Sequence, residues 1–134
     1  MRILFLGDVV GVSGCSKIFQ NLKSEIEKKK INFVVVNGEN SAEPGVGLTE
    51  EVCNDFFKCG VNVITSGNHV WDQKEIMNYI DKENRLLRPQ NLYEPAPGKG
   101  FEIYDFQNDI KIGVLNLMGN VFMKKCEDVF ETSK

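Results

Sequence analysis

No apolar run in this 134-residue sequence approaches the roughly 20 residues that a helix needs to span a bilayer. The apolar stretch at residues 3–6 meets Gly7 and Asp8 at once, so it is too short for the apolar core of a signal peptide. It predicts instead a first strand buried on both faces. Together these absences predict a cytoplasmic protein without a membrane partner.

The sequence also lacks a surplus of basic residues. It has 16 Lys and Arg against 19 Asp and Glu, a net charge of -3. Proteins that bind nucleic-acid backbones usually carry a clustered basic surplus, so the composition argues against a broad nucleic-acid surface. The only basic runs, at residues 28–30 and 124–125, are typical of solvated edges.

The cysteines form no C-x-x-C pair, which argues against a zinc ribbon and a thioredoxin-like site. We predict that all four are small buried hydrophobic residues with free thiols. They are Cys15, Cys53, Cys59 and Cys126.

The first part of the sequence alternates between strand and helix patterns. The predicted elements are a strand at 3–6, a helix at 16–29, a strand at 33–36, a helix ending at Cys59, a strand at 61–65 and a helix at 73–80. We expect Thr49 to be the N-cap of the second helix, Gly60 to end it, and Asp72 to be the N-cap of the third. This βαβαβ order predicts a parallel sheet with right-handed crossovers.

The pattern changes after Pro89. Residues 95–98 predict an extended loop, and residues 101–106 and 111–117 predict a β-hairpin with a polar turn at 107–109. The tail from Met118 shows no closing element. The predicted fold class is therefore α/β, a parallel βαβαβ sheet followed by a hairpin, within one domain of residues 1–134.

Polar residues follow each of the three predicted parallel strands. Asp8 follows the first strand, Glu39 and Asn40 follow the second, and Asn68 and His69 follow the third. Because ligands of open parallel sheets bind outside the carboxyl ends of the strands, we expect these side chains to share one crevice. Two nearby carboxylates repel each other, and divalent cations would hold both of them ionised.

A nucleotide-binding Rossmann-like domain is the weaker alternative. The glycines at positions 7, 11 and 14 do not have the G-x-G-x-x-G spacing, and no G-x-x-x-x-G-K-[ST] occurs. In addition, Asp8 would repel a pyrophosphate placed at the start of the following helix. A cation site explains this carboxylate better.

Three of these segments resemble the N-terminal motifs of the calcineurin-like metallophosphoesterases. They are GDVVG at 7–11, NGEN at 37–40 and GNHVWD at 67–72. They are most similar to the bacterial YmdB-like branch, in which Glu takes a bridging position that is Asp in most of the superfamily. Residues 86–91 and 116–119 match that branch too. The resemblance implies the N-terminal half of a metallophosphoesterase β-sandwich.

The resemblance also implies roles for the site residues. Asp8 would bind a first metal ion, Glu39 would bridge two, and Asn68 would bind the second. Asn40 would contact metal or phosphate, and His69 would be the general acid. The implied cofactors are two divalent ions, iron or alternatively manganese, and the implied substrates are small phosphodiesters that include 2′,3′-cyclic nucleotides.

The sequence departs from this family in its histidines. The family completes its site with several histidines from its C-terminal half, and His69 is the only histidine here. We therefore expect an N-terminal portion of a longer enzyme. The alternative is a catalytically inactive interaction module, which would form a homo-oligomer or bind a separate C-terminal half.

Each residue also has a structural interpretation. Asp8 could be a turn or capping residue, Asn40 and Asn68 could be turn residues with left-handed backbone, and His69 could be structural. Trp71 is expected to be a packing anchor under its loop. Arg88 is expected either to contact a phosphate or to form a surface ion pair.

Overall fold

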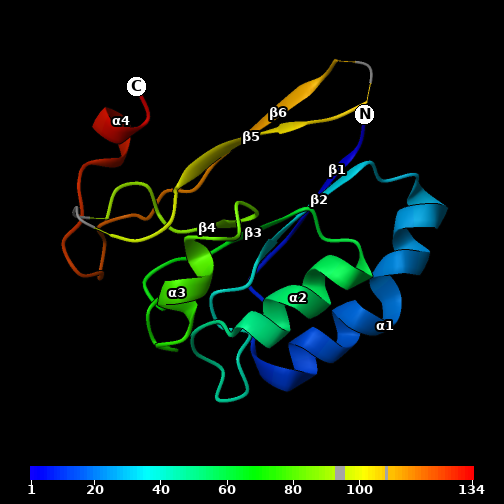
Figure 1. Cartoon of the computed structure of the whole chain (residues 1–134), viewed down its shortest axis with the longest axis horizontal. Coiled ribbons are helices and arrows are strands. Elements are labelled where there is room, and N and C mark those ends of the chain that lie inside the picture. The colour runs from blue at the N-terminus through cyan, green and yellow to red at the C-terminus, as the bar shows by residue number, and fades with distance from the viewer. Residues whose placement is uncertain (93–95, 108) are drawn as a thin grey trace.

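The computed structural model describes residues 1–92, 96–107 and 109–134 (Figure 1). Its elements are β1 Ile3–Leu6, α1 Gly11–Lys29, β2 Phe33–Asn37, α2 Glu50–Cys59, β3 Val63–Thr65, α3 Ile76–Ile80, β4 Leu86–Leu87, β5 Phe101–Asp105, β6 Lys111–Leu115 and α4 Val129–Thr132. Pro95 of the predicted loop and Asn108 of the predicted hairpin turn lie outside the described residues. No helix within the described ranges is long and apolar enough to cross a membrane.

The predicted α/β architecture is confirmed. Strands β1 to β4 form a parallel sheet in the order β1-β2-β3-β4, and β5 and β6 form an antiparallel hairpin. Strand β4 is two residues long and was not predicted, because a run of two leucines has no periodicity of its own. The parallel order brings the carboxyl ends of β1, β2 and β3 to the same edge.

Two apolar layers cover the two faces of this sheet. On one face, Val34, Val36 and Ile64 pack with buried residues of the helices, among them Phe56 and Ile76. Figure 1 shows α1 and α2 side by side on this side of the sheet. The residues that alternate with them point to the other face and pack against the hairpin. This second cluster contains Phe33, Val35, Val63, Leu87 and Ile112.

Strand β1 is only partly covered, which corrects the prediction of a strand buried on both faces. Leu4 and Leu6 are half-buried against the helices, but Ile3 and Phe5 are 52% and 63% exposed. Since β1 is at the edge of the sheet, the hairpin that covers β2 and β3 leaves its outer face open. An apolar run indicates a strand, but the position of that strand in the sheet decides how far its two faces are buried.

The predictions for α2 are confirmed at both ends. The Thr49 side chain accepts a hydrogen bond from the Val52 N–H at 3.2 Å. Gly60 ends the helix with φ of 110°, a left-handed conformation that glycine adopts without strain. The four cysteines are buried with free thiols, as predicted.

Helix α1 begins at Gly11, five residues before the predicted start at Ser16. The glycines at its beginning have low helix propensity, which led to the prediction of a loop. However, a Cβ at Gly14 would lie 3.2 Å from Val9 Cγ1, so the missing side chain permits close packing. The Gly11 N–H also donates to the Asn40 carbonyl at 2.8 Å. Tertiary contacts therefore override local propensity here.

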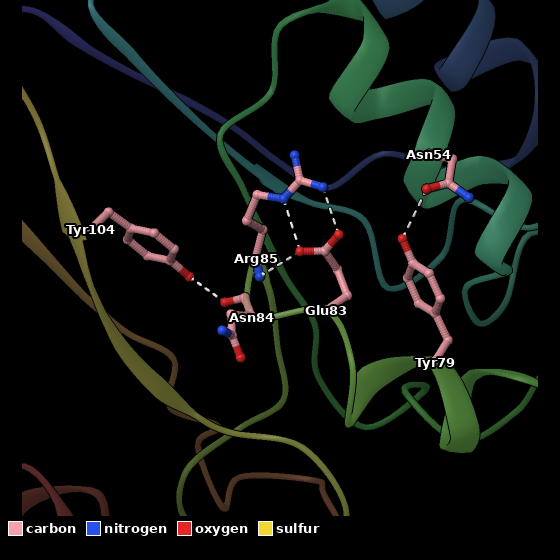
Figure 2. A network of polar contacts seen from close by, with 6 residues as sticks. All are labelled: Asn54, Tyr79, Glu83, Asn84, Arg85 and Tyr104. Atoms are coloured by element: carbon pink, nitrogen blue, oxygen red, sulfur yellow. Dashed lines mark hydrogen bonds and ion pairs between the residues drawn. The ribbon is translucent and has the colours of Figure 1, made fainter.

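A polar network connects the β4 segment to its neighbours (Figure 2). The Arg85 side chain donates two hydrogen bonds to Glu83, at 2.8 and 2.6 Å, and its guanidinium lies 3.8 Å from the ring centre of Phe57 in α2. On the hairpin, the Tyr104 hydroxyl donates to the Asn84 carbonyl at 2.7 Å. The Arg85 guanidinium lowers the pKa of Glu83. This network joins the helical layer, the sheet and the hairpin.

Helix α3 contacts α2 through a second polar pair in the same view. The Tyr79 hydroxyl donates to Asn54 Oδ1 at 3.0 Å (Figure 2). Burial raises the pKa of Tyr79 to about 12, so the phenol keeps its proton and remains a donor at neutral pH. The pair fixes α3 after the loop that carries the predicted third motif.

Candidate functional site

Asp8 and Asn40 bring the ends of β1 and β2 together. The Asn40 Nδ2 donates to Asp8 Oδ2 at 2.8 Å, although the two residues are 32 positions apart. The backbone supports this contact, because Val10 and Asn40 form an isolated parallel bridge. Asp8 is exposed and Asn40 is half-buried. The first two predicted loops therefore meet at one edge of the sheet.

Glu39 joins the loop after β2 to the loop after β3. Its Oε2 accepts a hydrogen bond from the His69 N–H at 3.3 Å. A Cβ added at Gly67 would lie 2.6 Å from Glu39 Oε1, so a side chain at this position would displace the carboxylate. The Glu39 N–H donates to Asn37 Oδ1 at 3.2 Å. Four of the five predicted site residues are thus linked by contacts through neighbouring loops.

One oxygen of the site lacks a partner among the described residues. Asn40 Oδ1 is buried and forms no hydrogen bond within that part of the chain. A buried acceptor without a partner costs about 1–3 kcal/mol, and a cation is one way to satisfy it. Carboxylate and amide oxygens are hard ligands that suit divalent cations. The donor set at Asp8, Glu39 and Asn40 therefore fits a metal ion.

Asn68 lies between Gly67 and His69 and is exposed, with no hydrogen bond to other described residues. Outside residues 93–95 and 108, no three side chains of His, Cys, Asp or Glu come together as a metal site. The candidate oxygen ligands here are two carboxylates and two amides, of Asp8, Glu39, Asn40 and Asn68. The metal-binding and catalytic roles of Asp8, Glu39, Asn40, Asn68 and His69 stay predictions.

The prediction that Asp72 is a helix N-cap is wrong. Helix α3 begins at Ile76, and Asp72 Oδ2 lies 2.6 Å from His69 Nδ1. The intervening residues form turns in which the Gln73 side chain donates to the Val46 carbonyl at 3.1 Å. The His-x-x-Asp spacing could have indicated the contact, because residues three apart meet in a helical turn.

Arg88 is 3% exposed, so its side chain does not lie at the surface, as one of its two expected roles required. Its guanidinium donates to backbone carbonyls of the loop that follows, including those of Pro89 at 2.8 Å and Pro97 at 3.1 Å. It supports the connection to the hairpin, and a contact to phosphate stays a prediction. Trp71 packs against the main apolar cluster, as expected.

Sequence reasoning did not identify the role of Asn116. It is 8% exposed at the end of β6, and its Nδ2 donates to the Ser66 carbonyl at 2.8 Å and the Leu87 carbonyl at 3.1 Å. Ser66 begins the loop that carries Gly67 and His69. The hairpin, which packs on the face of the sheet away from the helices, therefore holds the loop after β3 in place.

The fold places the chain in a class of phosphatase-like α/β proteins. A structure described as a novel phosphatase from Mycoplasma pneumoniae superposes with a TM-score of 0.90 at 33% identity, covering 99% of this chain and 49% of that chain. A hypothetical protein from Thermus thermophilus superposes with a TM-score of 0.91 at 31% identity, covering 99% of this chain and 51% of the other.

Sequence similarity identifies the family. The profile of the YmdB-like protein family matches residues 4–134, and the chain belongs to this family. A relative from Bacillus subtilis (strain 168), named 2′,3′-cyclic-nucleotide 2′-phosphodiesterase, is 42% identical over 130 residues. That match covers 97% of this chain and 48% of the relative. The chain thus spans about half the length of this relative.

Proposed function

We propose that the chain supplies the oxygen ligands of a metal-dependent phosphodiesterase site that acts on small phosphodiesters, including 2′,3′-cyclic nucleotides. The observation that carries the proposal is the joined set of strand-end loops, with a buried Asn40 oxygen that no described residue pairs. The name of the Bacillus subtilis relative supports the reaction class. Iron is the proposed metal, with manganese as the alternative.

In this proposal Asp8, Glu39, Asn40 and Asn68 would hold two divalent ions. Bound divalent ions supply Lewis acidity toward phosphoryl oxygens and lower the pKa of water. Asn40 donates to Asp8 and so orients its own Oδ1 away from that carboxylate. The Glu39 carboxylate accepts from the main-chain N–H of His69, which keeps it at the loop that carries the proposed acid.

His69 is the proposed general acid. In the hydrolysis of a cyclic phosphodiester, the oxygen of water forms a new P–O bond and releases one proton to the solvent, and one ester P–O bond breaks. The leaving ribose oxygen then takes a proton from the imidazole. The position of His69 beside Glu39 supports this role, since proton transfer requires the acid close to the reacting phosphate.

Metal titration of the purified chain tests the proposal. We expect Glu39→Gln to weaken Mn²⁺ binding at least about tenfold, because a charged ligand becomes neutral. Glu25→Gln, which alters an exposed ion pair on α1, is the matched control and should bind as the native chain does. Binding is measured by calorimetry, and hydrolysis of 2′,3′-cyclic AMP is followed in parallel. Equal Mn²⁺ affinity in the native chain and Glu39→Gln would contradict the proposed site.

An interaction module is the second candidate, favoured by the open face of β1. Ile3 and Phe5 are exposed on an edge strand, and a half-open apolar hollow lined by Leu4, Leu6, Ile18 and other residues lies beside it. Exposed apolar surface of this kind marks a site for another polypeptide. Metal analysis separates the two functions, because two tightly held ions per chain would contradict an inactive module.

A further inference from the structure

His69 and Asp72 form a close side-chain pair next to the proposed site. His69 Nδ1 lies 2.6 Å from Asp72 Oδ2. A carboxylate can only accept hydrogen bonds, so in this contact the imidazole Nδ1 carries the hydrogen and donates. Within the described part of the chain, no residue forms a hydrogen bond with the other ring nitrogen, Nε2. The pair therefore distinguishes the two nitrogens of the ring.

The backbone around Asp72 is held in place by two loops. The Asp72 N–H donates to the His69 carbonyl at 3.1 Å, which closes a turn between the two residues. Gly47 packs against this turn, since a Cβ there would lie 3.2 Å from Asp72 Cβ. Gly47 also has φ of +82°, a conformation that favours glycine. The contact thus rests on packing between loops as well as on the two side chains.

His69 is fixed from its backbone side too. Its N–H donates to Glu39 Oε2 at 3.3 Å, so the residue lies between two carboxylates. Glu39 contacts the main chain and Asp72 contacts the ring. With both contacts made, the imidazole has one defined orientation relative to the proposed metal ligands.

We propose that Asp72 is a positioning residue for His69. It holds the imidazole as the Nδ1–H tautomer when the ring is neutral, and it leaves Nε2 as the nitrogen that exchanges a proton with the substrate. The inference rests on the proposed function for its catalytic meaning. The tautomer itself is a property of this chain, and it can be measured without metal or substrate.

The proposal does not require the His69–Asp72 contact to stabilise the fold. Both side chains are partly exposed, at 35% for His69 and 42% for Asp72, and exposed ion pairs contribute little to stability. The tautomer follows from the identity of the partner, because the Asp72 carboxylate can only accept a hydrogen from Nδ1. When a partner fixes one ring nitrogen, the role of the other is set.

NMR of the ¹⁵N-labelled chain tests the proposal directly. His69 is the only histidine, so every imidazole nitrogen signal belongs to it. At a pH well above the usual range for histidine, the two nitrogen shifts report which nitrogen carries the hydrogen. We expect the native chain to show predominantly the Nδ1–H form. A native chain that is predominantly Nε2–H would overturn the proposal.

Variants at position 72 complete the test. Asp72→Ala removes the acceptor and should move the population toward the Nε2–H form. Asp72→Asn keeps an acceptor oxygen and should largely restore the native form. Asp55→Ala removes an exposed aspartate that pairs with Lys58 on α2, and it should leave the tautomer unchanged. An Asp72→Ala chain with the native tautomer would refute the positioning role.

Turnover separates this inference from the proposed function. In a chain that hydrolyses 2′,3′-cyclic AMP, Asp72→Ala should lower kcat several-fold and change KM little. A tautomer change with full turnover would show that Asp72 orients His69 without a catalytic consequence, which contradicts the proposed role. A tautomer change in a chain without metal affinity would contradict the proposed function and leave the assignment of the tautomer intact.

Discussion

Gly67 shows how a single residue determines the shape of the candidate site. It has no side chain at the point where the Glu39 carboxylate approaches, and both carboxylate oxygens would collide with an added Cβ. The glycine is buried, and it directly precedes Asn68 and His69. The Glu39 carboxylate can therefore take its position only because Gly67, in the neighbouring loop, has no side chain.

We predict that Gly67→Ala displaces the Glu39 carboxylate and weakens Mn²⁺ binding at least about tenfold, because a ligand that moves by an ångström loses its geometry. Gly119→Ala is the matched control, since a Cβ there would have no atom within 4 Å. Calorimetric titration gives the affinity, and the midpoint of thermal unfolding shows whether each variant is folded. A folded Gly67→Ala chain with native affinity would contradict this prediction.

The candidate residues could be chosen from the sequence, but their contacts could not. The strand-end rule indicated Asp8, Glu39, Asn40, Asn68 and His69. It could not show that Asn40 would donate to Asp8 and leave its own oxygen without a partner among the described residues, because that depends on side-chain orientation.

Sequence reasoning was wrong about the N-cap role of Asp72 and about a surface position for Arg88. In both cases, local rules for caps and surface charges failed because a partner from a folded turn or loop decides the role.

At the scale of elements, the Glu83–Arg85 pair links the β4 segment to α2. The carboxylate accepts two side-chain hydrogen bonds from the guanidinium, and the guanidinium lies over the Phe57 ring. The pair lowers the pKa of Glu83 in the folded chain. Its contribution to the free energy of unfolding is therefore complete above the pKa of the unfolded chain and is lost as the pH falls through the lower, folded pKa.

We predict that Glu83→Gln reduces the acid dependence of stability, because a neutral side chain cannot gain a proton in the unfolded state. The free energy of unfolding should fall by less than about 1 kcal/mol at neutral pH, since the Arg85 side chain is partly exposed. Urea unfolding at several pH values between neutrality and the acid range measures the slope. Glu43→Gln, on an exposed loop residue, is the control, and an unchanged slope in Glu83→Gln would refute the prediction.

Helix ends with side-chain caps were predictable, and ends set by tertiary contact were not. Thr49 and Gly60 bound α2 through interactions local in sequence, so the sequence pattern was sufficient. The start of α1 depends on packing between Gly14 and Val9, and no propensity scale contains that contact. The four-residue helix at the end of the chain begins at Val129 after an Asp128 cap, and it is too short to give a periodic pattern.

Across the whole molecule, apolar surface is unevenly distributed. The outer face of the hairpin exposes Phe101, Ile103 and Leu115, and the edge strand exposes Ile3 and Phe5. Strand edges of this kind pair readily with other chains. The sequence predicted the two strands of this hairpin, but it could not show that one face would pack on the sheet while the other left apolar side chains exposed.

We predict that Phe5→Ser reduces self-association of the purified chain, because it removes the most exposed aromatic residue of the edge strand. Sedimentation velocity over a range of concentrations measures the effect. Met77→Ser, which changes a side chain exposed to 45% on α3, is the control and should leave association unchanged. Equal self-association of the native chain and Phe5→Ser would show that the chains do not associate through the exposed face of β1.

The two side-chain hydrogen bonds of Asn116 couple the hairpin to the parallel sheet. One carboxamide donates to the carbonyl of Ser66, just after β3, and to that of Leu87, at the end of β4, and so ties β6 to both strands. Any tilt of β6 must pull on the segment that carries His69, three residues beyond Ser66. A partner that displaces the hairpin would therefore also displace the loop that carries His69, the proposed general acid.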